Sequence, residues 1–133
     1  MLNPLFTLTD RLTSQRWWPL GRWLPLLICM AVIFWFSDQP RDAIMDFGTW
    51  DLLIKKGAHM LGYAGLAVAA YIATGRYWLA WLIAAFYAMS DEFHQTFVPG
   101  RTGTPTDVLI DAVGAAVGLL VVWLVLRSKR KRG

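Results

Sequence analysis

Four apolar stretches separated by short polar segments constrain this chain more than any other feature of its sequence. A helix needs about 20 largely apolar residues to cross a bilayer, within a working range of about 17–25. The second and fourth stretches meet this length alone. The first stretch reaches this length if it includes residues 17–21 and the Arg22 side chain extends to the interface. The third reaches it if the helix extends into residues 90–93 or is tilted. The sequence therefore predicts an all-α fold, a four-helix transmembrane bundle. The stretches are 23–36, 58–74, 77–89 and 108–126.

The composition supports a membrane protein and excludes several other classes. Hydrophobic residues make up 56% of the 133 residues and charged residues 17%, whereas a soluble domain carries about 25% charged residues. A water-soluble core of this size cannot enclose so much apolar surface, and the single Cys29 excludes a disulfide framework. We expect one transmembrane domain over 23–126, preceded by a cytoplasmic or interfacial segment, 1–22, and followed by a basic cytoplasmic tail, 127–133. No small-residue cleavage site follows the first stretch, so it is expected to remain as a span.

The distribution of Lys and Arg predicts the orientation. Four spans place nine basic residues on the side of the two termini and four on the opposite side. Because an excess of Lys and Arg marks the cytoplasmic side, both termini are expected to be cytoplasmic. The localisation expected is the bacterial plasma (inner) membrane, with multiple spans. The basic tail indicates a topology anchor at an anionic surface, and no nucleic-acid-binding module accompanies it. The partners expected are therefore membrane lipids and not nucleic acid.

The second apolar stretch is preceded by polar residues with helical spacing. Lys56, His59 and Tyr63 follow an i, i+3, i+7 pattern and share one helix face. Gly62 and Gly65 predict a close approach of a neighbouring helix. A purely structural interpretation also stands, in which Lys56 extends to the interface and the other two form interfacial hydrogen bonds.

The third stretch ends in a pair of carboxylates, Asp91 and Glu92, within one turn of Gln95. Carboxylates at a helix C-terminus oppose the helix dipole, so another group is expected to stabilise them. A metal ion, Lys56, Arg101 or a shared proton would each do so. The following Pro/Gly-rich segment, 98–105, predicts a turn that displays Arg101.

The fourth helix is expected to begin with Thr106 or Asp107 as its N-cap. Asp111 follows one turn later, and Gly114 and Gly118 continue the same face as a G-x-x-x-G pair. Because a carboxylate in an apolar helix must face protein or water, we expect this face to pack against a neighbouring helix, with the second as the preferred partner. The three polar clusters are then expected to form one site near the outer interface.

These motifs resemble those of the VanZ-like family of small bacterial membrane proteins. The resemblance rests on K-x-x-H-x-x-x-Y at 56–63, D-E-x-H-Q-x-x-V-P-G-R at 91–101 and D-x-x-x-D-x-x-G-x-x-x-G at 107–118, and covers about 24–126. It implies a polytopic membrane protein of the cell envelope. The founding member of the family is associated with resistance to the glycopeptide teicoplanin. Family members often carry Asn where this chain has Asp111.

Three functions remain open from the sequence. The first is binding or modification of a lipid-linked, phosphate-bearing envelope substrate at the outer leaflet, for which Arg suits phosphate and a carboxylate or His suits proton transfer. Whether the chain is an enzyme stays open. The second is a small metal-binding or transport protein, with a divalent metal ion as its cofactor and His59, Glu92, Asp107 and Asp111 as its ligands. The third is a non-catalytic envelope assembly factor; an oligomer is compatible with all three. The candidate catalytic residues are Lys56, His59, Tyr63, Asp91, Glu92, Gln95, Arg101, Asp107 and Asp111.

Overall fold

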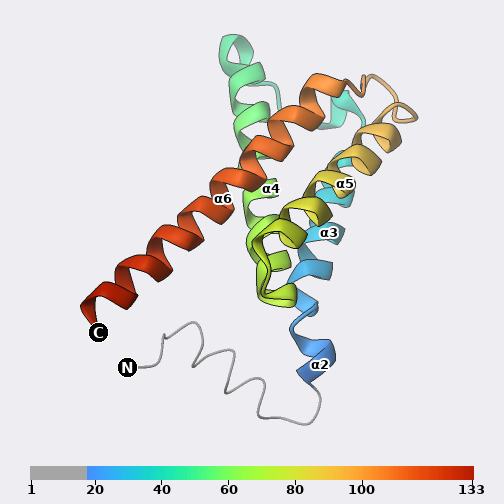
Figure 1. The fold of residues 1–133 in the computed structure, drawn as a ribbon. Helices are drawn as coiled ribbons and strands as arrows, with labels where there is room; N and C mark the ends of the chain where they lie inside the picture. The colour runs from blue at the N-terminus through green and yellow to red at the C-terminus, as the bar shows by residue number, and fades with distance from the viewer. Residues whose placement is uncertain (1–17) are drawn as a thin grey trace.

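The computed structural model describes residues 18–133, and in this part of the chain all regular structure is helical. Four long helices run alternately up and down (Figure 1), and α4 packs against the other three, most extensively against α6. The expected all-α, four-helix architecture is confirmed. The elements are α2 (Trp18–Gly21), α3 (Leu24–Ser37), η1 (Arg41–Ala43), η2 (Gly48–Trp50), α4 (Asp51–Thr74), α5 (Tyr77–Gln95) and α6 (Pro105–Arg132).

The first apolar stretch does not form the single long helix that the sequence predicted. A short helix, α2, ends at Gly21, and α3 begins only at Leu24. Pro25 lies in the first turn of α3 and has no N–H to continue a helix from the preceding turn. The helix boundary therefore falls where proline is best tolerated. Residue 17, which was also expected to belong to this span, lies outside the described residues.

The other three long helices contain the predicted stretches and extend beyond them. α4 begins at Asp51, seven residues before the predicted start at 58, and ends at Thr74, where it is followed by Gly75 with a left-handed φ of 69°. α5 extends through Gln95, so the expected extension into 90–93 is confirmed. α6 continues through the basic tail to Arg132. Among the described residues, α6 alone is clearly long and apolar enough to cross a membrane by length and composition.

The interior of the bundle is built from small residues. Most of its buried hydrophobic residues are alanines, among them Ala67, Ala70, Ala84 and Ala115, each 0% exposed. The large apolar side chains lie outside, as Trp35 of α3 does at 59% exposure and Phe86 of α5 at 61%. The helices therefore approach closely through small side chains while their bulky residues face the surroundings.

The closest approach is between α4 and α6. A Cβ atom added at Gly114 would lie 2.6 Å from the carbonyl oxygen of Met60, and one added at Gly118 would lie 2.6 Å from that of Ala64. The expectation that this glycine pair packs against the second predicted helix is confirmed. The expectation for Gly62 and Gly65 is wrong, because only a side-chain atom 3.9 Å away approaches the first and nothing within 4 Å approaches the second.

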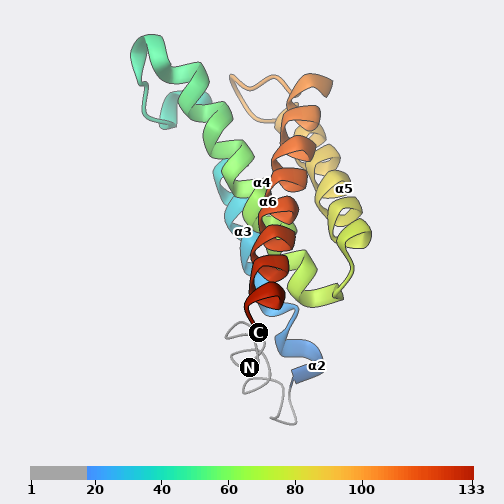
Figure 2. The same cartoon turned by 60° about the vertical axis from the view of Figure 1, so that its left-hand side comes forward.

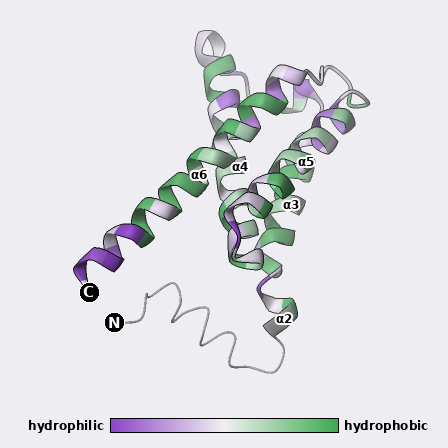
Figure 3. Ribbon diagram, in the orientation of Figure 1, coloured by the Kyte–Doolittle hydropathy of each residue, from purple (hydrophilic) through white to green (hydrophobic). Residues whose placement is uncertain are grey.

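The two ends of the bundle differ in polarity. α2 and the C-terminal end of α6 lie at one end in both views, and the start of α4, the end of α5 and the start of α6 lie at the other (Figures 1 and 2). Figure 3 shows a hydrophobic middle section of α6 with a hydrophilic C-terminal end. The polar side chains singled out in the sequence collect at the end opposite to the basic tail.

Substitutions at these glycines test the α4–α6 contact. Gly118→Ala places a methyl group against the α4 backbone, and overpacking of this kind costs about 1–3 kcal/mol. Gly65→Ala is the matched control, because its Cβ meets nothing within 4 Å. The free energy of unfolding, measured by denaturant titration of the purified protein in detergent, is expected to fall for Gly118→Ala and not for Gly65→Ala. Equal stability of the two variants would contradict the close crossing.

Candidate functional site

The polar end of the bundle holds one connected group of charged and polar side chains. The start of α4 contributes Lys56, His59 and Tyr63, which the helix places on one face, as predicted. The end of α5 contributes its two carboxylates, and the start of α6 contributes Asp107 and Asp111. The predicted convergence of the three clusters is confirmed by the contacts given below.

Asp91 is buried and held by hydrogen bonds on one of its two oxygens. Its Oδ2 accepts from the Ser37 hydroxyl at 2.7 Å, from the Tyr63 hydroxyl at 3.2 Å and from the Gln95 side-chain amide at 3.2 Å. Gln95 also donates to the Ser37 hydroxyl at 3.3 Å. Neutral donors on three helices therefore stabilise this carboxylate, and no Lys or Arg is hydrogen-bonded to it in the described part of the chain.

Glu92 is held by the loop between α5 and α6. Its Oε2 accepts from the backbone N–H of Thr104 at 3.1 Å. A Cβ atom added at Gly103 would lie 2.2 Å from the backbone oxygen of Glu92, so only glycine fits there. The backbone of the loop thus packs directly against the backbone at the end of α5. The Glu92 carboxylate accepts a hydrogen bond from a backbone N–H group at the start of the next helix.

Thr104 is also the N-cap of α6, which corrects the expected cap at Thr106 or Asp107. Its hydroxyl accepts from the backbone N–H of Asp107 at 3.3 Å, and Pro105 occupies the first turn. The same hydroxyl donates to Asp107 Oδ2 at 2.8 Å. The signal was present in the sequence: T-x-x-D with proline after the threonine is a capping-box pattern.

Lys56 pairs with Asp107 across the α4–α6 interface. Its Nζ lies 3.0 Å from Asp107 Oδ1, and both side chains are about one-third exposed, at 37% and 30%. This pair lies at the rim of the site. Asp107, which was expected among the metal ligands, has both oxygens engaged, one by Lys56 and one by Thr104.

His59, Glu92 and Asp111 meet in the middle of the site. Each offers one ligand atom, and these atoms all lie within 4.8 Å of one another. Asp111 is 0% exposed, and neither of its oxygens has a hydrogen-bond partner among the described residues. The nearest charged group given for it is His59 Nδ1, 3.4 Å from Oδ1. Of the candidate metal ligands, these three are brought together.

Arg101 is directed to the end of α3. Its Nε donates to the Gln39 carbonyl and its Nη2 to the Phe36 carbonyl, both at 3.0 Å. Partial burial lowers the pKa of the guanidinium, and the nearby carboxylates of Asp91 and Glu92 oppose this shift. The guanidinium, expected from the sequence to suit phosphate, thus caps the carbonyl end of a helix, where a cation is favoured.

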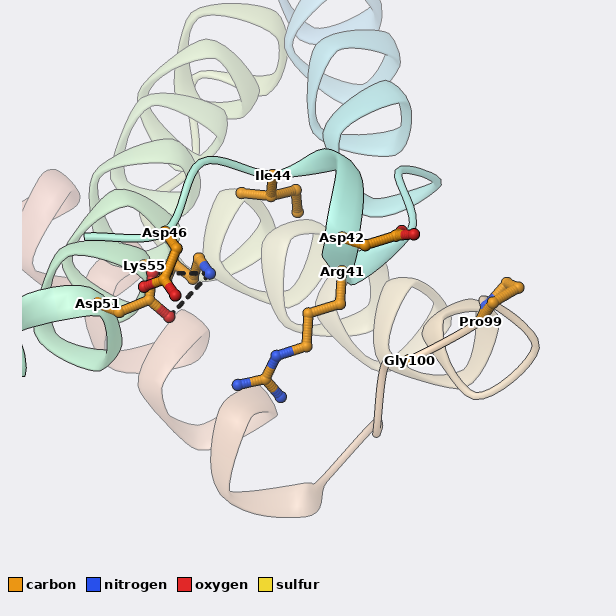
Figure 4. A pocket seen from close by; sticks show the side chains of 8 residues that line it. All are labelled: Arg41, Asp42, Ile44, Asp46, Asp51, Lys55, Pro99 and Gly100. Carbon is orange, nitrogen blue, oxygen red and sulfur yellow. Dashed lines mark hydrogen bonds and ion pairs between the residues drawn. The ribbon is translucent and has the colours of Figure 1, made fainter. Parts of the chain in front are cut away.

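A pocket of about 600 Å³ opens beside the cluster, between η1, the start of α4 and the 99–100 turn. Figure 4 shows the Arg41 guanidinium extended into this space, with the Lys55–Asp51 ion pair at 2.8 Å on one side. Within the described residues no hydrogen bond or ion pair to the Arg41 guanidinium is present. The carboxylate of Asp46 also lines the pocket.

Sequence reasoning missed Ser37, Arg41 and the structural roles of Thr104 and Arg101. No local pattern marks Ser37, because its partner Asp91 lies 54 positions later in the chain. His94, inside the D-E-x-H-Q motif, lies outside the cluster and contacts Asp38 at 3.0 Å. Only the packing of α3 against α4 and α5 assigns these positions.

These observations define the class of protein: an all-α helical bundle with buried carboxylates at one end. The family described as VanZ/LLP1 matches residues 22–126, and the chain belongs to this family. The match covers α3, α4, α5 and most of α6, and the whole polar cluster. Comparisons with curated proteins and with solved structures gave no match.

The helix-capping role of Arg101 is testable by truncation. Arg101→Ala removes two hydrogen bonds that a charged side chain donates to backbone carbonyls. We expect the free energy of unfolding to fall by about 1–3 kcal/mol, because water partly screens these two bonds. Arg41→Ala is the matched control in the same region, since its guanidinium has no hydrogen-bond or ion-pair partner in the part of the chain that the structure describes. Thermal unfolding of both variants in detergent measures the difference. A more damaging effect of Arg41→Ala would contradict this assignment.

Proposed function

We propose that the protein is a multi-pass membrane protein of the bacterial cell envelope that binds the phosphate-bearing headgroup of a lipid-linked substrate at the membrane–water interface. The observation that carries this proposal is the pocket at the polar end, with the Arg41 guanidinium inside it and without a hydrogen-bond or ion-pair partner among residues 18–133. The buried carboxylate cluster lies next to this pocket, since Gly100 lines the pocket and Thr104, four residues later, binds Glu92.

The arrangement of apolar side chains supports the membrane part of the proposal. Soluble monomers rarely expose large contiguous apolar patches, whereas membrane helices pack through small residues and turn bulky ones to lipid. The bundle follows the second pattern, with alanines inside and residues such as Trp35, Phe86 and Leu120 outside. At about 1.5 Å per residue, helices of the length of α4, α5 and α6 reach roughly 28–42 Å, against a hydrocarbon core of about 30 Å.

The proposed orientation has the polar end outside and both termini in the cytoplasm. The basic end of α6 lies opposite to the polar cluster, and the positive-inside tendency assigns such an end to the cytoplasm. The pocket and the cluster would then face the outer leaflet, where lipid-linked envelope substrates present their headgroups.

Arg41 is the pocket residue that fits a phosphate, while Asp42 and Asp46 line the same pocket and favour a ligand that also carries hydroxyl groups. The planar guanidinium of Arg41 can donate two parallel hydrogen bonds to one phosphate. Carboxylates such as Asp46 accept hydrogen bonds from hydroxyl groups, as a sugar would offer. The volume of about 600 Å³ is that of a small-molecule site. Lys56 and Arg101 are both engaged by the protein, so we assign the phosphate contact to Arg41.

The topology is tested by cysteine labelling in a Cys29→Ser background. Single cysteines at Thr49, Thr102 and Ser128, all exposed, report on the two ends of the bundle. A membrane-impermeant maleimide added to intact cells is expected to label the first two positions, and to label Ser128 only after permeabilisation. Labelling of Ser128 alone in intact cells would contradict the orientation.

The headgroup is tested with a polyprenyl phosphate in nanodiscs, compared with the polyprenol that lacks the phosphate. We expect selective binding of the phosphate by the wild-type protein and at least about tenfold weaker binding by Arg41→Gln, because a charge-assisted hydrogen bond contributes about 1.5–3 kcal/mol. Arg76→Gln, in the loop between α4 and α5 at the other end of the bundle, is the matched control.

Native mass spectrometry reads out the bound lipid. Equal retention of the two lipids would overturn the headgroup assignment and favour a non-catalytic assembly role. The link to glycopeptide resistance stays a prediction from the family and is measured separately, as teicoplanin sensitivity of cells with and without the protein.

A further inference from the structure

We propose that His59, Glu92 and Asp111 form a binding site for a divalent transition-metal ion of the class of Zn²⁺ and Mn²⁺. The three ligands come from three helices, α4, α5 and α6, and their ligand atoms lie within 4.8 Å of one another. This site is distinct from the Arg41 pocket and does not depend on the headgroup proposal.

The environment of Asp111 points to a ligand independently of the clustering. The residue is 0% exposed, and both of its oxygens lack a hydrogen-bond partner in the described part of the chain. Burial of a carboxylate whose oxygens accept no hydrogen bond is costly, and native structures normally satisfy such a group. The 3.4 Å between His59 Nδ1 and Asp111 Oδ1 exceeds the usual N–H···O range of about 2.7–3.2 Å. The imidazole therefore contacts one Asp111 oxygen within ion-pair distance, and the other oxygen has no partner among the described residues.

The charges around the cluster favour binding of a cation. Lys56 is paired with Asp107, and Arg101 donates to backbone carbonyls. Glu92 and Asp111 therefore share one histidine, and Asp91 lies close enough to act on the same imidazole electrostatically. An ion with two positive charges would balance the two carboxylates, whereas an anion would add to their repulsion.

The donor types select the class of ion. Imidazole with carboxylates suits divalent first-row metals, whereas Mg²⁺ and Ca²⁺ prefer oxygen ligands alone. In a tetrahedral site, ligand bonds of about 2.0–2.2 Å place two ligand atoms of one ion about 3.3–3.6 Å apart. The observed limit of 4.8 Å therefore requires the side chains to close by up to about 1.5 Å around the ion. Three protein ligands leave a coordination position for water or for an oxygen of a substrate.

The experiment measures metal binding by the full-length protein, purified in detergent without any phosphate lipid and stripped with a chelator. After equilibration with Zn²⁺ or Mn²⁺ and removal of free metal, elemental mass spectrometry is expected to give one ion per chain, and Mg²⁺ at the same concentration is expected to give none. His59→Gln and Asp111→Asn are each expected to weaken binding more than about 100-fold, beyond the 10–100-fold typical of groups behind the ligands.

Two variants are matched controls for residue type. His94→Gln changes the other histidine of the chain, whose partner is Asp38, and Asp107→Asn changes the carboxylate paired with Lys56. Both are expected to retain the ion. Circular dichroism and gel filtration check folding, and His59→Gln, with a side chain 30% exposed, serves if Asp111→Asn does not fold.

The proposal is overturned if the wild-type protein binds no more Zn²⁺ or Mn²⁺ than His59→Gln, or if the two controls lose the ion as completely as the cluster variants. Because no phosphate lipid is present, failure here leaves the headgroup assignment standing. Failure of lipid binding in turn leaves the metal site standing.

Discussion

The backbone-level contact between α4 and α6 is the constraint on which the rest of the structure depends. Gly114 lies against Met60 and Gly118 against Ala64, so the two contacts are four residues apart on both helices. Toward the polar end of the same helix pair, Asp111 meets His59 and Asp107 meets Lys56. Without side chains at the two glycines, the helices come close enough for a buried carboxylate to reach a histidine on its neighbour. The site is therefore a consequence of the helix crossing.

The two most buried carboxylates, Asp91 and Asp111, differ in the hydrogen bonds that they accept. Asp91 accepts three hydrogen bonds from hydroxyl and amide groups, which is a complete structural explanation for one of its oxygens. Asp111 accepts no such bond from any described residue, although it is also buried. Lys56 and Arg101, the cations expected to compensate the cluster, are engaged at its rim and at the end of α3. Protein contacts among the described residues thus leave both oxygens of Asp111, and the second oxygen of Asp91, without a hydrogen-bond partner.

Much of the fold could be predicted from the sequence, because helix-forming apolar stretches and i, i+4 polar spacing are local properties. Helical periodicity alone predicts the face shared by Lys56, His59 and Tyr63 and the face shared by Asp111, Gly114 and Gly118. Pro25 was a local signal for the break between α2 and α3. The prediction of one continuous helix gave more weight to the apolar stretch than to this proline.

Other features depend on which helices become neighbours, and no local pattern fixes that. Gly62 and Gly65 carry the same small-residue signal as Gly114 and Gly118, yet α6 crosses α4 over a different face. Ser37 acquires its role only when the end of α3 lies beside Asp91, and Arg101 acquires its own only when the α5–α6 loop meets the same end of α3. These contacts join residues more than 50 positions apart.

The central claim, that the register of α4 and α6 builds a cation site around Asp111, is tested most directly by an experimental structure of the zinc-equilibrated protein with anomalous scattering at the zinc edge. The account predicts one anomalous peak within about 2.3 Å of a side-chain atom of each of His59, Glu92 and Asp111. A structure without that peak, in which the Asp111 oxygens are satisfied by hydrogen bonds from protein or water, would contradict it.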